Sequence, residues 1–208
     1  MKHKKKKNKN AEVSGALAKV QEINLLDMTI QCTREYGAYT IENRAIPDYR
    51  DGLKPVQRRL LWAMTHLNMP NKGNTKKSAR VNGDCTGKYH PHGDAGVYGA
   101  LANMVNAPEP YAIGQGNFGD YDEGPAAPRY TECKLSKYSE LYLLDKSYLD
   151  VVPMVKNYTG EFEEPVYLPA KLPNILINGC EGIATGCSVV IPSFSLDSVK
   201  RLVVKILK

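Results

Sequence analysis

Apolar residues recur at helical spacing in several stretches of the chain. One apolar stripe begins just after Pro55 and ends near Leu67, which predicts a helix between them, with proline in the first turn where its missing N–H costs nothing. The members of this stripe are Val56, Leu60, Ala63, Met64 and Leu67. The same period predicts helices over residues 76–87, 94–104, 135–146 and 196–207, and over 14–33 at least in the second half of that range.

Proline and glycine divide the rest of the chain into short pieces. Proline-punctuated apolar runs at residues 166–168 and 175–177 predict strands, and the glycine-rich stretch 108–128 predicts a loop with short extended segments. Residues 39–43 match either a short strand or the end of the helix before them. Asp94 is expected to cap the helix that begins there. Three short helices in succession, with basic residues on the first two, suggest a helix-turn-helix unit.

Composition indicates a folded protein of one domain and part of a second, with 208 residues, 42% of them hydrophobic and 24% charged. No apolar run approaches the roughly 18 residues that span a membrane, and no signal peptide is visible. We therefore expect a cytoplasmic protein with no membrane partner. The five cysteines are odd in number and form no C-x-x-C pair, which predicts reduced thiols.

The net charge of +6 comes from the first ten residues, which hold six lysines and no acid. We expect this tail, residues 1–12, to be disordered and to act either as a solubilising extension or as an arm that touches DNA. The remaining residues sum to zero, yet residues 44–90 carry ten basic against three acidic side chains. Such segregation is typical of a surface that binds a polyanion, the alternative being a solvated face balanced by nearby acids.

Two glycine-rich strings imitate nucleotide-binding motifs. Residues 114–119 read G-x-G-x-x-G, but residues 120–128 cannot open the helix that a dinucleotide site needs. Residues 83–88 are one residue too short for a P-loop, and no serine or threonine follows the lysine. Nucleotide binding by this chain is therefore the least favoured hypothesis, and titration with ATP or NAD tests it.

His90 and His92 flank a proline. No cysteine or third histidine stands at ligand spacing, so we predict no metal ligands here. The two histidines are instead either hydrogen-bonded turn residues or contacts to a phosphate.

Arg129 and Tyr130 form the most suggestive pair. A phenol, with a pKa of about 10, is a poor nucleophile at neutral pH, but a guanidinium beside it favours the phenolate and offers donors to a phosphate oxygen. The alternative is an ordinary packed tyrosine, one of 13 in the chain.

Five strings, in the same order, closely resemble the breakage-reunion subunit of type IIA DNA topoisomerases, which is the A subunit of DNA gyrase and its counterpart in topoisomerase IV. They occupy residues 43–64, 76–101, 114–120, 126–132 (AAPRYTE) and 172–186, within a resemblance that covers about residues 24–208. Residues 39–47 also resemble the medium topoisomerase subunit of large bacteriophages, which leaves a bacterial or a viral origin open. The resemblance implies an α+β fold, with a winged-helix domain at 13–160 and the start of a mixed α/β tower domain at 161–208.

The resemblance also implies a reaction. In this family the tyrosine matched by Tyr130 attacks a DNA phosphodiester and becomes joined to the 5′ end of the break, which is covalent catalysis without net hydrolysis. Arg129 matches the arginine that stabilises the phosphorus centre in the transition state. Arg44 and His92 match residues placed near the scissile group, and His90 is their neighbour.

DNA contacts and partners follow from the same resemblance. Backbone contacts that carry little sequence specificity are assigned to Lys54, Arg58 and Arg59 on one helix, Lys77 and Arg80 on the next, and His90. Ile183 matches an isoleucine that wedges between base pairs, the alternative being a core residue at a strand end. The implied partners are duplex DNA, a second copy of the chain, and an ATPase subunit that binds ATP and holds Mg²⁺ in its TOPRIM domain.

Three positions depart from the family pattern. Gln57 stands where gyrases usually have histidine, and we expect it to preserve a polar contact. Ala95 and Gly99 replace the serine and acidic residue that anchor quinolone drugs, which predicts reduced quinolone sensitivity. Because family members continue well beyond residue 208, we expect a fragment or a split-gene product, and the choice among supercoiling, decatenation and relaxation stays open.

The main alternative function is a non-catalytic helix-turn-helix module that binds duplex DNA.

Overall fold

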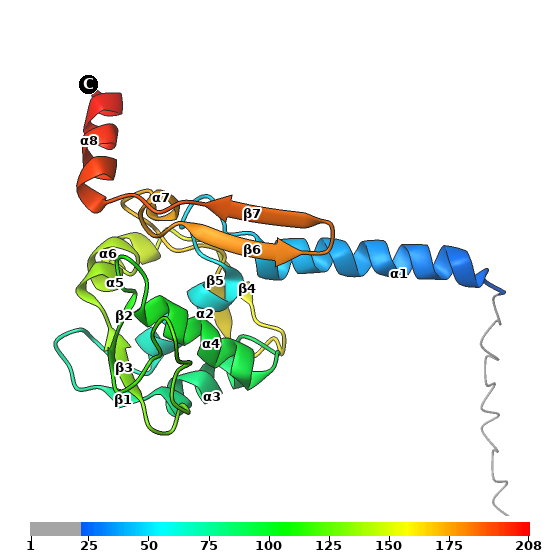
Figure 1. Cartoon of the computed structure of the whole chain (residues 1–208), viewed down its shortest axis with the longest axis horizontal. Helices are drawn as coiled ribbons and strands as arrows, with labels where there is room; N and C mark the ends of the chain where they lie inside the picture. The colour runs from blue at the N-terminus through cyan, green and yellow to red at the C-terminus, as the bar shows by residue number, and fades with distance from the viewer. Residues whose placement is uncertain (1–21) are drawn as a thin grey trace, which may run out of the picture. The chain divides into compact units, whose positions relative to one another are not determined.

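The computed structural model describes residues 22–208, shown in Figure 1. The predicted lysine tail and the first part of the predicted helix 14–33 lie outside the described residues. The chain divides into two units, Met1–Glu35 and Tyr36–Lys208. The domain boundary predicted near residue 160 stays a prediction.

Helix α1 covers Leu25–Thr40 and continues directly into a five-residue π-helix, Ile41–Ala45. The predicted end near residue 33 was therefore wrong, and residues 39–43 belong to helix rather than strand. The wider turn is closed by a hydrogen bond from the Ile46 amide to the Ile41 carbonyl (3.2 Å). Pro47 follows and disfavours helical backbone at the residue before it, which ends the element.

Three helices, α2 (Pro55–His66), α3 (Ser78–Lys88) and α4 (Asp94–Val105), pack together in the larger unit (Figure 1). Their apolar stripes meet in a core whose fully buried members include Leu60, Leu61, Met64, Val81 and Leu101. The predicted helices at 55–67 and 94–104 are confirmed, and α3 begins two residues later than expected. Asp94 is the first residue of α4 and Gly93 is the cap, so the capping prediction was wrong.

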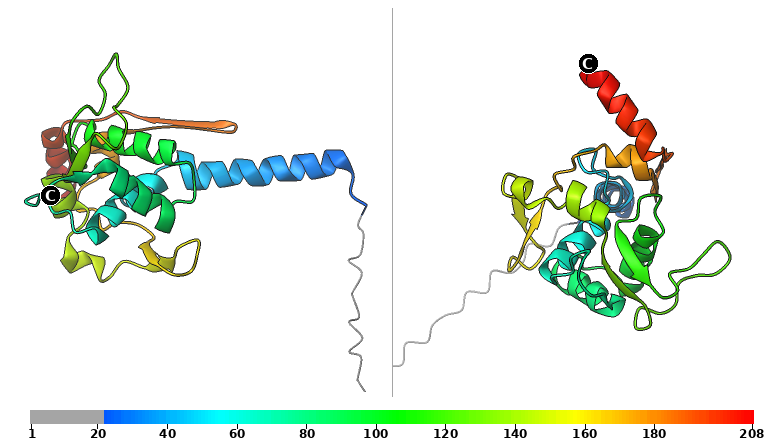
Figure 2. Two further views of the ribbon diagram at one scale, coloured as in Figure 1. Left: turned by 90° about the horizontal axis from the view of Figure 1, so that it is seen from below. Right: turned by 90° about the vertical axis from the view of Figure 1, so that its left-hand side faces the viewer.

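Small antiparallel sheets complete the unit. Strands β1 (Lys76–Lys77), β3 (Glu132–Leu135) and β2 (Ala112–Gln115) pair in that order, with Cys133 opposite both Lys76 and Gly114. Strands β4 (Met154–Lys156) and β5 (Glu163–Pro165) form a hairpin, seen in yellow apart from the green strands in Figure 2. A second hairpin joins β6 (Cys180–Ala184) to β7 (Cys187–Ile191). The fold is thus mixed α/β, and the winged-helix assignment remains an inference.

The later helices depart from the predicted pattern. The predicted helix 135–146 is two short helices, α5 (Lys137–Tyr142) and α6 (Lys146–Leu149), because Ser136 and Asp145 each cap a separate N-terminus. The strand expected at 166–168 was wrong, since pairing ends at Pro165. The strand expected at 175–177 was also wrong and is helix α7 (Asn174–Asn178). Helix α8 (Leu196–Leu207) matches its prediction.

Asp51 joins four segments inside the larger unit through its carboxylate and its backbone carbonyl. The carboxylate is fully buried and accepts hydrogen bonds from Arg58 Nε (2.6 Å) and NH2 (3.0 Å). It also accepts the backbone amides of Leu53 (3.0 Å) and Leu168 (2.8 Å). The Asp51 carbonyl accepts from Asn174 Nδ2 (2.8 Å), which explains why the α7 segment turns inward rather than pairing as a strand.

The β6–β7 hairpin packs against the π-helix through a bare backbone contact. A Cβ added at Gly182 would lie 2.1 Å from the carbonyl oxygen of Ala45, so only glycine permits this approach. The contact places β6 directly beside the turn that carries Arg44.

We expect Asp51→Asn to lower the free energy of unfolding by about 3–5 kcal/mol, because it leaves the Arg58 guanidinium buried without its counter-charge. The matched control is Asp48→Asn, which removes the exposed pair between Asp48 and Arg50 and is expected to cost less than about 1 kcal/mol. Urea unfolding of both variants measures the difference. Equal losses would show that the buried pair does not organise the fold.

Gly182→Ala is expected to lower the free energy of unfolding by about 1–3 kcal/mol, since the new methyl overlaps a backbone oxygen that cannot rotate away. Gly83→Ala on α3 is the control, because its added Cβ meets nothing within 4 Å and alanine favours helix. Thermal unfolding together with limited proteolysis of the hairpin measures the effect. A stable Gly182→Ala variant with an unaltered cleavage pattern would contradict the close contact.

Candidate active site

Tyr130 and Arg129 lie on an exposed turn before β3. The Tyr130 side chain is 64% exposed, so the alternative of an ordinary packed tyrosine is excluded. The Arg129 guanidinium carbon lies 4.5 Å from the centre of the Tyr130 ring. The turn is closed by a hydrogen bond from the Tyr130 amide to the Ala127 carbonyl (2.9 Å). A phenol is thus presented to solvent with a cation against its face.

The N-terminus of α3 holds this turn in place. The Ser78 amide donates to the Thr131 carbonyl (3.0 Å), and the Ala79 amide donates to the Pro128 carbonyl (3.0 Å). These amides belong to the first turn of a helix, where no partner exists within the helix itself. The two carbonyls bracket Arg129 and Tyr130, so α3 fixes the backbone on both sides of the pair.

Hydrogen bonds among three buried hydroxyl groups also hold the Tyr130 turn, and sequence analysis did not predict them. Thr131 Oγ1 lies 2.9 Å from both the Ser78 Oγ and the Tyr98 Oη, and Tyr98 Oη donates to the Ala126 carbonyl (2.6 Å). Thr131 and Ser78 are fully buried. The sequence shows that Thr131 directly follows Tyr130 in the string AAPRYTE, but no local pattern indicates that Thr131 contacts Tyr98.

A second group of predicted residues gathers around a cavity of about 460 Å³. Arg44, His90 and His92 all line it, together with Tyr39 and the start of α4. Arg44 comes from the π-helix, whose wider turn precedes the Pro47 bend, and the histidines follow the end of α3. The structure therefore brings Arg44 together with two histidines that lie far from it in the sequence.

His90 is buried and uncharged in this cavity. Burial lowers the pKa of His90 to about 4, and the positive charges of Arg59, His92 and Arg44 act in the same direction. Arg59 NH1 lies 3.0 Å from His90 Nδ1. The His90 and His92 rings meet edge to face with centres 4.6 Å apart, and His92 Nε2 lies 3.1 Å from the Tyr39 hydroxyl. His92 itself is exposed, so it is the histidine that a ligand reaches first.

The two groups lie at opposite ends of α3. The Tyr130 turn is bonded to Ser78 and Ala79 at the first turn, whereas His90 and His92 follow the last residue, Lys88. A helix of 11 residues is about 16 Å long. One copy of the chain therefore does not bring Tyr130 together with His92 and Arg44.

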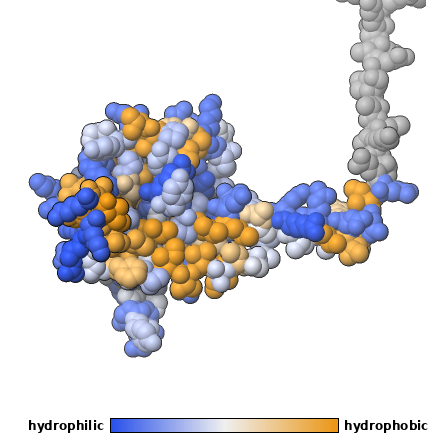
Figure 3. Space-filling view, turned by 90° about the horizontal axis from the view of Figure 1, so that it is seen from above, coloured by the Kyte–Doolittle hydropathy of each residue, from blue (hydrophilic) through white to orange (hydrophobic). Residues whose placement is uncertain are grey.

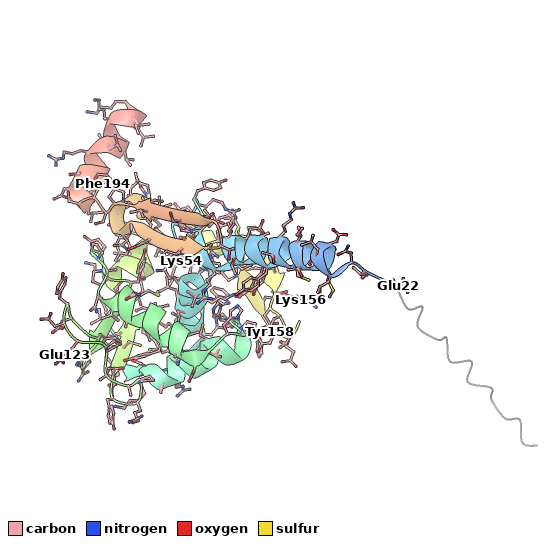
Figure 4. All side chains as sticks on the ribbon, turned by 45° about the vertical axis from the view of Figure 1, so that its right-hand side comes forward. Glu22, Lys54, Glu123, Lys156, Tyr158 and Phe194 are labelled. Atoms are coloured by element: carbon pink, nitrogen blue, oxygen red, sulfur yellow. The ribbon has the colours of Figure 1, made fainter. Side chains whose placement is uncertain are left out.

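The predicted DNA contacts have different surroundings. Arg80 is exposed, and Lys77 is exposed with its amine 2.9 Å from Glu132. Lys54 lies beside the hairpin, where its Nζ donates to the Glu181 carbonyl (2.6 Å; Figure 4). Arg58 is 8% exposed and paired with Asp51, so we correct its assignment from a DNA contact to a structural residue.

Two further residues of α2 have partners within the protein. The guanidinium of Arg59 is engaged by Glu164 and His90, two partners that sequence analysis did not predict. The Gln57 side chain accepts the Lys54 amide (2.9 Å) and thus serves the start of α2.

Ile183 is an exposed apolar side chain on the hairpin. It is 79% exposed, so the alternative of a core residue at a strand end is wrong. Val190 on the neighbouring strand is 74% exposed. Figure 3, which views the molecule from above, shows apolar side chains gathered on the face that includes this hairpin.

Between residues 22 and 208, no three histidine, cysteine or acidic side chains lie close enough to hold a metal ion. The same residues form no helix of the length and apolar character that crossing a bilayer requires. The cysteines among them are all free thiols.

Comparison with known proteins shows which family the chain resembles. Residues 44–208 match the family of the DNA gyrase/topoisomerase IV A subunit. The chain is 48% identical over 169 residues to the DNA gyrase A subunit of Thermotoga maritima, a match that covers 78% of this chain and 20% of the relative. It is 43% identical over 197 residues to the DNA topoisomerase 4 A subunit of Pseudomonas aeruginosa, covering 92% and 26%.

A third relative matches over nearly its whole length. A DNA gyrase A-subunit sequence of Spiroplasma citri is 42% identical over 194 residues, which is 91% of this chain and 85% of that relative. Against the other two relatives, this chain spans about a fifth to a quarter of their length. With a family match over most of the residues and this coverage, the chain belongs to the family of DNA gyrase and topoisomerase IV A subunits.

Proposed function

We propose that this chain supplies the DNA-breaking and rejoining residues of a type IIA topoisomerase. The observation that carries the proposal is the exposed Tyr130 phenol beside the Arg129 guanidinium on a turn fixed by α3. Membership of the gyrase and topoisomerase IV A-subunit family supports it.

The proposed reaction is a transesterification. The Tyr130 oxygen forms a bond to a backbone phosphorus while the bond from that phosphorus to the 3′ oxygen breaks, and the phenol proton moves to a base or to water. Arg129 neutralises charge on the phosphate as the transition state forms. Because one phosphoester replaces another, the free 3′ hydroxyl can attack in return and reseal the strand.

DNA binding is assigned to the residues that remain accessible. Arg80 lies on α3, the helix whose first turn holds Tyr130, and Lys77 at the end of β1 directly precedes that helix, so both can contact phosphates near the bond that breaks. Ile183 is exposed enough to enter a base step and bend the duplex. Such contacts favour duplex DNA of any sequence, through a fold that we assign to the winged-helix class.

We further propose that the complete site forms between two copies of the chain. Since α3 separates Tyr130 from the cavity lined by Arg44, His90 and His92, a second copy is needed to bring such a cavity to the phenol. A symmetric dimer makes two such sites, one for each DNA strand.

Type IIA topoisomerases generally use Mg²⁺, and between residues 22 and 208 no three histidine, cysteine or acidic side chains lie close enough to hold a metal ion. From the family resemblance, we assign the metal and ATP to an ATPase partner subunit. The cytoplasm, of the host if the chain is viral, is the proposed location.

Tyr130→Phe is expected to abolish protein-linked DNA, by about a thousandfold or more, because the nucleophilic oxygen is gone. Its affinity for duplex DNA should stay within about twofold. The measurement mixes the chain with its partner subunit, Mg²⁺ and supercoiled plasmid, and then quenches with detergent.

Tyr121→Phe is the matched control, since that ring is fully exposed in the loop before the turn and contacts nothing in the proposed site. It should cleave like the unmodified chain. Linked DNA that persists in Tyr130→Phe would refute the assignment. Binding without any cleavage by the unmodified chain would favour the alternative, a non-catalytic DNA-binding module.

Mixing Tyr130→Phe with His92→Ala tests the shared site. Each variant alone should be nearly inactive, whereas mixed dimers hold one complete site and should restore cleavage to as much as about a quarter of the normal level, mainly as nicked DNA. A mixture no more active than its components would place Tyr130 and His92 of the same copy in one site.

A further inference from the structure

Glu164 forms an ion pair with Arg59 in which both carboxylate oxygens accept hydrogen bonds. Its Oε2 accepts from Arg59 Nε (2.8 Å) and its Oε1 accepts from Arg59 NH2 (2.7 Å), a two-point pair in which Glu164 is 8% exposed. Such a pairing fixes the plane of the guanidinium as well as its position. The third nitrogen, NH1, is thereby directed at His90 Nδ1, 3.0 Å away.

This contact decides which ring nitrogen of His90 carries the proton. A guanidinium has donors and no acceptor, so Nδ1 must accept and must be unprotonated. The remaining proton of the neutral ring is then on Nε2. His90, which lines the cavity, therefore has an uncharged ring with an Nε2–H donor.

The surroundings of His90 keep the ring neutral. Burial is the largest cause of the lowered pKa of His90, and Arg59 from α2, His92 from the same segment and Arg44 from the π-helix act electrostatically in the same direction. Glu164 is the carboxylate in this cluster, and Arg59 lies between it and the ring. Protonation of His90 would thus add a positive charge to a group that already holds several.

The same hairpin that carries Glu164 also fixes the end of α3. Tyr158 Oη donates to the Gly87 carbonyl (2.6 Å), and Asn157 Nδ2 donates to the Lys88 carbonyl (2.5 Å). Figure 4 shows Lys156 and Tyr158 at this end of the helices. The β4–β5 hairpin therefore positions both the segment that leads into His90 and the carboxylate that orients its partner.

We propose that Glu164 is a positioning residue of the cleavage site, which holds Arg59 so that His90 presents its Nε2–H, as a neutral donor, to a DNA phosphate oxygen. The role toward phosphate rests on the proposed function. The effect of Glu164 on the His90 ring does not.

The test compares Glu164→Gln with Glu163→Gln, the neighbouring exposed residue, whose contact with Trp62 Nε1 is made by its backbone carbonyl. Nitrogen-15 NMR of the His90 ring at pH 7.5 should show only the Nε2–H tautomer in the unmodified chain and in Glu163→Gln. In Glu164→Gln the shifts should move toward the average of two exchanging tautomers. DNA cleavage by the complete enzyme should fall about tenfold, with DNA affinity unchanged within about twofold.

Arg59→Met supplies a second variant if Glu164→Gln does not fold. It removes both the guanidinium donor to Nδ1 and the positive charge, so the pKa of His90 should rise from about 4 by part of the difference from its ordinary value, because burial, the largest cause of the lowering, remains. His90 shifts that are unchanged in Glu164→Gln, or a His90 titration unchanged in Arg59→Met, would overturn the proposal. Ring shifts that respond while cleavage does not would overturn the catalytic part of it. Absence of cleavage in the unmodified enzyme would instead refute the proposed function.

Discussion

A single buried carboxylate, that of Asp51, organises the larger unit. It neutralises Arg58 inside the core and at the same time accepts backbone amides from its own loop and from the segment that contains Leu168. A buried guanidinium without such a partner would be strongly unfavourable, so the loop, α2 and the later segment are fixed relative to one another. Because α2 also carries Arg59, the position of the cavity residues depends on this pair in turn.

Helix α3 separates the two halves of the proposed chemistry. Its first turn supplies unpaired amides, which the Tyr130 turn satisfies, and its last turn is satisfied by side chains of the β4–β5 hairpin. Each end of one helix thus lies beside one set of residues of the proposed site. A helix cannot bend to bring its own ends together, and this geometry is why the proposed site calls for a second copy.

The polar contacts around His90 and the close contact at Gly182 serve a common purpose. Both position a residue of the proposed site through an element distant in sequence, Glu164 for His90 and the β6 backbone for the turn that bears Arg44. Each contact is specific because it needs a particular chemistry, a carboxylate that accepts two hydrogen bonds in the first case and a residue without a side chain in the second.

The sequence by itself determined the features that are local. The helices α2, α4 and α8 follow from apolar spacing, and Arg129 lies beside Tyr130 because they are consecutive. Tertiary structure decided the rest: it buried Arg58, turned residues 174–178 into helix, exposed Ile183 and separated Tyr130 from His92. A basic residue has the same letter whether it meets a phosphate or a buried carboxylate, and only the partner supplied from across the fold distinguishes the two.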